Sequence, residues 1–136
     1  MKMENRKILV VDDESDMRIY LSTVVETMGF EPIVAKDGAE ALEKARSVLP
    51  ALVILDVMMP KIEDGLRTYQ QFREDERLGT TPIIMLSAIA RKTFFYSIRM
   101  LQPSSGNQFP EPEAYMEKPP DADELNRLIA EHMPGG

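Results

Sequence analysis

Hydrophobic residues gather in short runs along this chain, and segments with a different spacing separate the runs. Four runs are strongly apolar and a fifth is weaker: KILVVD (7–12), PIVA (32–35), ALVILD (51–56), PIIMLS (82–87) and, weakly, EAYMEK (113–118). Three of them are continuous rather than alternating, which is typical of strands that are covered on both faces. We therefore expect five short strands, several of them buried on both sides.

The segments between these runs have the periodicity of amphipathic helices. Asp37 and DADE (121–124) are suited to begin a helix, and Gly29 is suited to end one. The positions that we expect to face the core are Met17, Leu21, Val24, Val25 and Met28; Ala41, Leu42, Ala45, Val48 and Leu49; Leu66, Tyr69 and Phe72; Phe94, Ile98 and Leu101; Leu125, Leu128 and Ile129. Strands and helices alternate, which predicts an α/β fold with a doubly wound, five-stranded parallel sheet.

One segment breaks this alternation. Residues 102–113, QPSSGNQFPEPE, are rich in proline, glycine and serine and predict a loop that is long for a compact domain. We see neither an internal repeat nor a linker between domains, and a chain of 136 residues favours one domain. We expect a single domain over residues 1–136, with its core at about 6–133.

Composition excludes several classes of protein. The net charge of −7 argues against non-specific nucleic-acid binding by this chain alone. The absence of cysteine excludes disulfides and thiolate metal sites. The N-terminal MKMENRK lacks the apolar stretch of a signal peptide, and no apolar run approaches membrane-spanning length. We expect a cytoplasmic protein that does not enter the membrane.

Polar residues stand where the expected strands end. These residues are Asp12, Asp13 and Glu14 after the first strand, Asp56 after the third, Ser87 after the fourth and Lys118 after the fifth. In an open parallel sheet, ligands bind outside the carboxyl ends of the strands. Asp56 thus follows an apolar run because the strand belongs to the core while its tip lies at the functional edge.

The acidic residues at this edge suggest a cation site. Asp12, Asp13 and Asp56 would repel one another, and an all-oxygen site suits Mg²⁺. A phosphoryl group could bind beside the cation, where Lys118 neutralises part of its charge and Ser87 donates a hydrogen bond. A carboxylate nucleophile can form an acyl phosphate. Each residue alone has an ordinary explanation, such as a helix cap or a surface lysine; the hypothesis rests on all four strand ends together.

Four motifs in this order, LVVDDE, LVILDVMMP, PIIMLSA and YMEKP, resemble the receiver domain of two-component response regulators. The resemblance covers essentially the whole chain and implies a flavodoxin-like (βα)5 fold with strand order 2-1-3-4-5. It implies that Asp56 is the phosphoacceptor. It also implies that Mg²⁺ is held by Asp12, Asp13 and Asp56 together with the backbone carbonyl of Met58.

The resemblance further implies how such a site would act. Ser87 would be the switch hydroxyl, Tyr115 the switch aromatic and Lys118 the phosphate-binding lysine, with a cis bond before Pro119. The phosphoryl donor would be a histidine kinase or phosphotransfer protein, since the single histidine, His132, lies far along the chain from the carboxylates. A receiver catalyses only its own phosphorylation and dephosphorylation. It then alters the face formed by the fourth helix, fifth strand and fifth helix, which binds a downstream protein or a second copy of the receiver.

The chain departs from the family pattern in two places. The turn MPKIEDG (59–65) is one residue longer than the usual M-P-x-x-D-G, which predicts a displaced start of the third helix. The stretch from Ser87 to Lys118 is longer than usual, lacks G-A-x-x-Y and contains FFYSIRML (94–101). We expect the chemistry to carry over, whereas the output surface differs. Whether the chain is a stand-alone receiver or a piece of a longer protein stays open.

The consecutive aromatics Phe94, Phe95 and Tyr96 cannot all face the core from one helix, so one or two of them must lie toward its flank. Either the loop at 102–113 folds back over them, anchored by Phe109, or aromatics and loop form a partner surface.

Two rival functions are weighed against a phosphorylated receiver. A pseudo-receiver would bind partners without phosphorylation, but all the chemical residues are present. A phosphatase of the haloacid dehalogenase type also uses an aspartate nucleophile with magnesium. It needs a D-x-D motif, whereas residues 56–58 read DVM.

Overall fold

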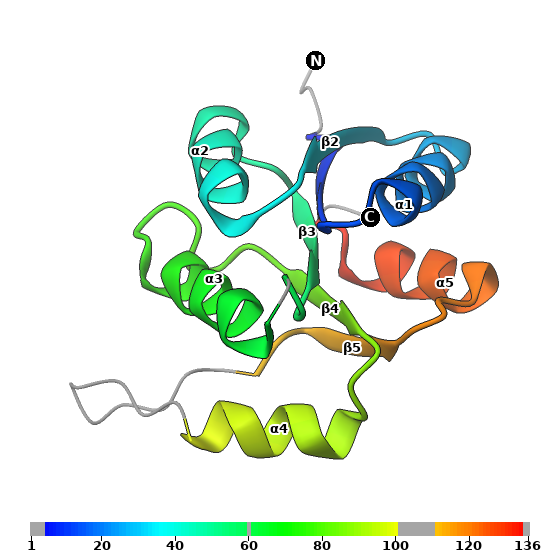
Figure 1. Ribbon diagram of the computed structural model, residues 1–136. Helices are drawn as coiled ribbons and strands as arrows, with labels where there is room; N and C mark the ends of the chain where they lie inside the picture. The colour runs from blue at the N-terminus through cyan, green and yellow to red at the C-terminus, as the bar shows by residue number, and fades with distance from the viewer. Residues whose placement is uncertain (1–4, 60, 101–110, 135–136) are drawn as a thin grey trace.

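The computed structural model describes residues 5–59, 61–100 and 111–134. In this part of the chain, strands and helices alternate in the order β1 (Lys7–Val11), α1 (Ser15–Thr27), β2 (Glu31–Ala35), α2 (Gly38–Val48), β3 (Leu52–Asp56), α3 (Ile62–Glu74), β4 (Ile83–Ser87), α4 (Arg91–Met100), β5 (Ala114–Glu117) and α5 (Ala122–His132). The strands form one parallel sheet in the order β2-β1-β3-β4-β5 (Figure 1). The predicted fold class and strand order are confirmed. None of the described helices is both long and apolar enough to cross a membrane.

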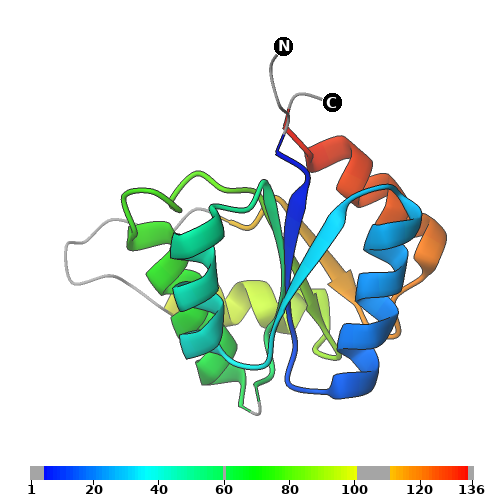
Figure 2. The same cartoon turned by 90° about the horizontal axis from the view of Figure 1, so that it is seen from above.

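Helices cover both faces of the sheet. Successive strand residues point to opposite faces, so Ile8 and Val10 of β1 pack with α1 and α5, whereas Leu9 and Val11 pack in the cluster that α2, α3 and α4 cover. Figure 2 shows the sheet between these two layers. Strands buried on both sides need apolar residues at every position, which explains the continuous runs of β1, β3 and β4.

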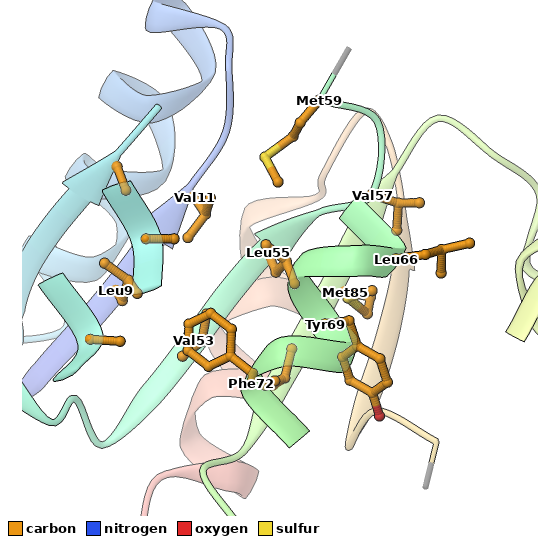
Figure 3. Close-up of a cluster of buried hydrophobic side chains, with 14 of the residues drawn as sticks. Leu9, Val11, Val53, Leu55, Val57, Met59, Leu66, Tyr69, Phe72 and Met85 are labelled. Atoms are coloured by element: carbon orange, nitrogen blue, oxygen red, sulfur yellow. The ribbon is translucent and has the colours of Figure 1, made fainter. Parts of the chain in front are cut away.

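The core beneath α3 illustrates how helical spacing builds this layer. Leu66, Tyr69 and Phe72 recur every three residues of α3, and all three are buried against the sheet. Figure 3 shows them facing side chains from β1, β3 and β4, among them Leu55 and Met85. Burying one such side chain contributes about 1.5–3 kcal/mol to the free energy of folding. The three buried residues therefore stabilise the packing of α3 against the sheet.

Most predicted helix ends are confirmed, and one core prediction is wrong. The side chain of Asp37 accepts a hydrogen bond from the Glu40 N–H at 2.8 Å, and Asp121 caps α5 in the same manner. Gly29 follows α1 with a φ of 88°. Leu49 was expected to face the core, but α2 ends at Val48 and Leu49 is a left-handed C-cap with a φ of 50°. Its side chain is 41% exposed, because the chain reverses direction there before β3.

The longer turn after β3 still lets α3 pack closely against the strand. Lys61 precedes α3, and its N–H donates to the side chain of Asp64 at 3.2 Å. A Cβ atom on Gly65 would lie only 1.9 Å from the Val57 carbonyl oxygen, so a side chain cannot be accommodated there. Whether the start of the helix is displaced relative to other receivers stays a prediction.

The aromatic prediction for α4 is confirmed. Phe94 is fully buried, Phe95 is half-buried, and Tyr96 is 58% exposed. Residues 101–110, which include Leu101 and Phe109, and the side chain of Ile98 lie outside the described residues.

Candidate functional site

The parallel sheet places the candidate residues at one edge, where the carboxyl ends of its strands lie. Asp12 directly follows β1, Asp56 is the last residue of β3, and Ser87 is the last of β4. Lys118 follows β5, and its backbone N–H donates to the Ser87 carbonyl at 2.8 Å. Because β1, β3, β4 and β5 are successive neighbours in the sheet, four segments far apart in the chain end side by side.

Three carboxylates form the centre of this edge. Asp12, Asp13 and Asp56 each present an oxygen atom, and these atoms lie within 4.8 Å of one another. Asp12 and Asp56 are buried, whereas Asp13 is exposed. Backbone N–H groups orient the two buried carboxylates: that of Glu14 donates to Asp12 at 2.9 Å and that of Met58 donates to Asp56 at 3.1 Å.

The ammonium group of Lys118 lies among these carboxylates. The Nζ atom of Lys118 is 3.0 Å from Asp12 Oδ2, 3.3 Å from Asp56 Oδ2 and 3.6 Å from Glu14 Oε1. Three acidic side chains thus pair with Lys118, and Asp13 lies beside Asp12 and Asp56, so the pocket keeps an excess of negative charge when all are ionised.

Burial and charge shift the pKa values of the two central groups. Burial raises the pKa of Asp56 to about 7, and the Asp12 carboxylate adds to the rise while Lys118 opposes it. For Lys118, burial lowers the pKa, but Asp56 and Asp12 outweigh it and leave the pKa above its usual value. At neutral pH, Lys118 is therefore charged, and a further cation would favour the ionised form of Asp56.

The two residues predicted to switch lie beside this pocket. Ser87 is fully buried, and its Oγ accepts a hydrogen bond from the Ile89 N–H at 3.2 Å. The buried Tyr115 donates its O–H to the Ile89 carbonyl, and its ring stacks on Phe94 at a centroid distance of 4.5 Å. Burial is the main reason that the pKa of Tyr115 rises to about 12, so its phenol stays protonated and able to donate.

Comparison with known proteins decides the family. The family profile described as the response regulator receiver domain matches residues 8–130. This chain belongs to that family. The predicted resemblance to receiver domains of two-component response regulators is thereby confirmed.

The relatives of this chain are longer regulators, and the match covers only part of each. The probable transcriptional regulator ycf27 of Pyropia yezoensis is 46% identical over 89 residues, which are 65% of this chain and 35% of that protein. The regulatory protein AtoC of Escherichia coli strain K12 is 34% identical over 124 residues, covering 90% of this chain and 24% of that protein. The receiver thus spans about a third or less of the length of these relatives.

Solved structures with the same fold include chains of nearly the same extent as this one. The chemotaxis response regulator CheY4 of Vibrio cholerae superposes with a TM-score of 0.79 at 25% identity, covering 96% of the receiver and 99% of that chain. The N-terminal domain of a response regulator receiver protein from Methanoculleus marisnigri is 30% identical and superposes with a TM-score of 0.65. The match covers 96% of this chain and 97% of that one.

The receiver brings together most of the residues that the sequence predicted. Asp12, Asp13, Asp56 and Lys118 share one pocket, and the Lys118–Pro119 peptide bond is cis as predicted. The carbonyl of Met58 stays a prediction as a metal ligand.

Sequence reasoning missed two features. Glu14 was noted only as part of a strand end, yet it reaches Lys118. The ion pair between the buried Arg73 and the partly exposed Glu113 was not predicted at all. No motif marks either residue, because the partners lie far away in sequence.

Proposed function

We propose that the receiver accepts a phosphoryl group on Asp56 from a phosphohistidine of a histidine kinase or phosphotransfer protein. The observation that carries this proposal is the buried Asp56 carboxylate, which shares the Lys118 ammonium with Asp12 beside the exposed Asp13. A carboxylate oxygen of Asp56 attacks the phosphorus, and the P–N bond breaks with its electron pair left on the imidazole nitrogen. The products are an aspartyl phosphate and a neutral histidine.

The neighbouring residues have separate roles in this proposal. Lys118 moves from the Asp56 carboxylate to a phosphoryl oxygen and offsets part of the charge that the group brings. Ser87 turns its hydroxyl from the Ile89 N–H toward a phosphoryl oxygen. Tyr115 then changes rotamer within its contact with Phe94, which carries the change to α4.

The carboxylate cluster fits a bound Mg²⁺ ion. Its donors are all oxygen atoms from three converging side chains, the type of site that hard divalent cations prefer. Asp12, Asp13 and Asp56 would hold the ion together with the Met58 carbonyl. When bound, Mg²⁺ would neutralise part of the negative charge of the pocket and of the incoming phosphoryl group.

The wider role that we propose is that of a signalling switch. Residues 1–136 act as one receiver domain that catalyses only its own phosphorylation and dephosphorylation, in the cytoplasm. Phosphorylation changes a surface that binds a downstream protein, or a second receiver in a phosphorylation-dependent homodimer. The chain's negative charge supports a partner other than nucleic acid for this segment.

Mass spectrometry of the intact protein tests the proposal. Incubation with Mg²⁺ and acetyl phosphate should add one phosphoryl group to the wild type and none to Asp56→Asn. The control Asp123→Asn, which changes an exposed carboxylate in the first turn of α5, should be modified like the wild type. An unmodified wild type would contradict the proposal and favour a pseudo-receiver. Modification of Asp56→Asn to the same extent would remove Asp56 from its assigned role.

A further inference from the structure

An ion pair between the buried Arg73 and the partly exposed Glu113 joins α3 to the residue just before β5, at the opposite end of the strands from the carboxylates. The side chain of Arg73 is 3% exposed, and its Nη2 lies 2.7 Å from Oε1 of Glu113. The same oxygen accepts the backbone N–H of Ile83, also at 2.7 Å. Glu113 is the residue just before β5. Its side chain therefore connects the beginning of that strand to the last turn of α3 and to the first residue of β4.

The guanidinium of Arg73 is held on its other sides as well. Its Nη1 donates to the carbonyls of Thr81 at 2.9 Å and Gly79 at 3.3 Å, and its Nε donates to the Tyr69 hydroxyl at 3.1 Å. A planar, buried guanidinium with several fixed acceptors has little freedom to move. The position of the Glu113 carboxylate is thus set by a rigid part of the molecule.

The pairing of β5 makes this contact important. Strand β5 has four residues, and its register with β4 begins at Ile84 opposite Ala114. One residue earlier, the Ile83 N–H meets the side chain of Glu113 rather than a backbone carbonyl of β5. At the other end, the Lys118 N–H donates to the Ser87 carbonyl. Glu113 and Lys118 thus hold the two ends of a short strand.

We propose that Glu113 is a positioning residue that fixes the register of β5 and thereby places Lys118 among the carboxylates. A slip by one residue would turn every side chain of the strand to the other face, including Tyr115. The segment before Glu113 departs from the usual receiver sequence, and the ion pair sets the beginning of β5 independently of it. This inference rests on the proposed function, since it assigns the receiver's phosphate-binding lysine a support outside the site.

Two substitutions separate the functions of the Glu113 side chain. Glu113→Ala leaves the Arg73 guanidinium without its carboxylate and the Ile83 N–H without its acceptor, and burial makes both losses costly. Glu113→Gln keeps an oxygen acceptor of the same reach and loses only the charge.

Glu111→Ala is the matched control, because it removes a nearby exposed acidic side chain. Leu21→Ala is the stability control, because it creates a cavity beneath α1 on the other face of the sheet.

The first measurement is the affinity for beryllofluoride, a phosphoryl mimic, in the presence of Mg²⁺. It is followed by ¹⁹F NMR at a temperature at which circular dichroism shows every variant folded. We expect Glu113→Ala to weaken binding about tenfold or more, since small misplacements of a binding group have effects of that size. Glu113→Gln should restore most of the affinity, and Glu111→Ala and Leu21→Ala should bind like the wild type. A loss in Leu21→Ala equal to that in Glu113→Ala would overturn the proposal, because it would show a general effect of stability.

The second measurement needs no phosphoryl mimic. Amide hydrogen exchange in residues 114–118 should quicken in Glu113→Ala at least tenfold more than in residues 7–11 of β1. Unchanged protection in residues 114–118 would overturn the role of Glu113 as an anchor. If the wild type binds no beryllofluoride, the proposed function fails, and the exchange rates still decide the anchor by themselves.

Discussion

The most informative single residue is Asp56, a carboxylate buried in a strand end that is otherwise apolar. Its pKa rises from 3.8 to about 7 because burial and the Asp12 carboxylate disfavour its charge, against the opposing effect of Lys118. The folded protein therefore binds the Asp56 proton more tightly than the unfolded chain does. The stability that this group contributes is fully present below pH 3.8 and is lost as the pH rises to about 7.

We expect Asp56→Asn to stabilise the metal-free protein at pH 8, because it removes the buried charge. The gain in free energy of unfolding should be on the order of 1–3 kcal/mol and should shrink as the pH falls toward 4. Urea unfolding in the presence of a chelator at several pH values measures it. A gain that is the same at every pH, or no gain, would show that the ionised carboxylate is not penalised in the folded state.

Asp13 provides a second test at the scale of a residue. Mg²⁺ binding to the folded state alone should raise the melting temperature of the wild type, with about 2.7 kcal/mol of stabilisation at a hundred times the dissociation constant. Asp13→Ala should lose most of that gain because it removes the exposed member of the carboxylate cluster. The control Asp16→Ala, in the first turn of α1, should keep it. A wild type whose melting temperature ignores Mg²⁺ would count against the metal site.

At the scale of an element, α4 shows how neighbouring residues of one helix take different roles. Phe94 packs in the core and stacks on Tyr115. The half-buried Phe95 contacts the rings of both Phe94 and Tyr115, and Tyr96 is largely exposed. Successive helical positions differ by about a hundred degrees around the axis, so three in a row cannot share one buried face. The helix thus buries Phe94 in the core, packs Phe95 against that core and presents Tyr96 to solvent.

Substitutions in α4 should separate these roles. Phe94→Ala should lower the free energy of unfolding by about 3–5 kcal/mol, as expected for a fully buried phenylalanine. Tyr96→Ala should change it by less than about 0.5 kcal/mol, since an exposed side chain loses few contacts. Urea unfolding of the two variants provides the comparison. Similar losses in both would mean that Tyr96 is covered in solution.

At the scale of the whole molecule, the sheet connects the carboxylate pocket to α4 and β5. Ser87 and Tyr115 both contact Ile89, which lies between β4 and α4. Ser87 and Tyr115 thus share one neighbour, and Tyr115 in turn stacks on Phe94.

We expect beryllofluoride to change amide exchange across residues 90–115 more than across residues 15–50. The reason is that the former segment includes α4 and the beginning of β5, where Phe94 and Tyr115 stack, whereas the latter covers α1, β2 and α2. Hydrogen-exchange mass spectrometry with and without the mimic measures both segments in one sample. Equal or smaller changes in residues 90–115 would refute an output through α4 and β5.

The sequence by itself determined the elements and the chemistry of the strand ends. Continuous apolar runs predicted β1, β3 and β4, and Asp37 and Asp121 predicted helix caps, because periodicity and capping depend on residues close together in the chain. Asp56 and Lys118 could be predicted as site residues because a parallel sheet brings all its strand ends to one edge. Leu49 could not be placed, because the reversal after α2 moves it out of the helical pattern.

Only the tertiary structure decided how these groups act on one another. The bond from Lys118 to Asp12 joins positions 106 residues apart, and the sharing of that lysine with Asp56 and Glu14 depends on the order of the strands. The raised pKa of Asp56 likewise comes from burial by the surrounding elements, which no local pattern contains. The ion pair that holds Glu113 has the same origin, since α3 and the residue before β5 meet only when the sheet is assembled.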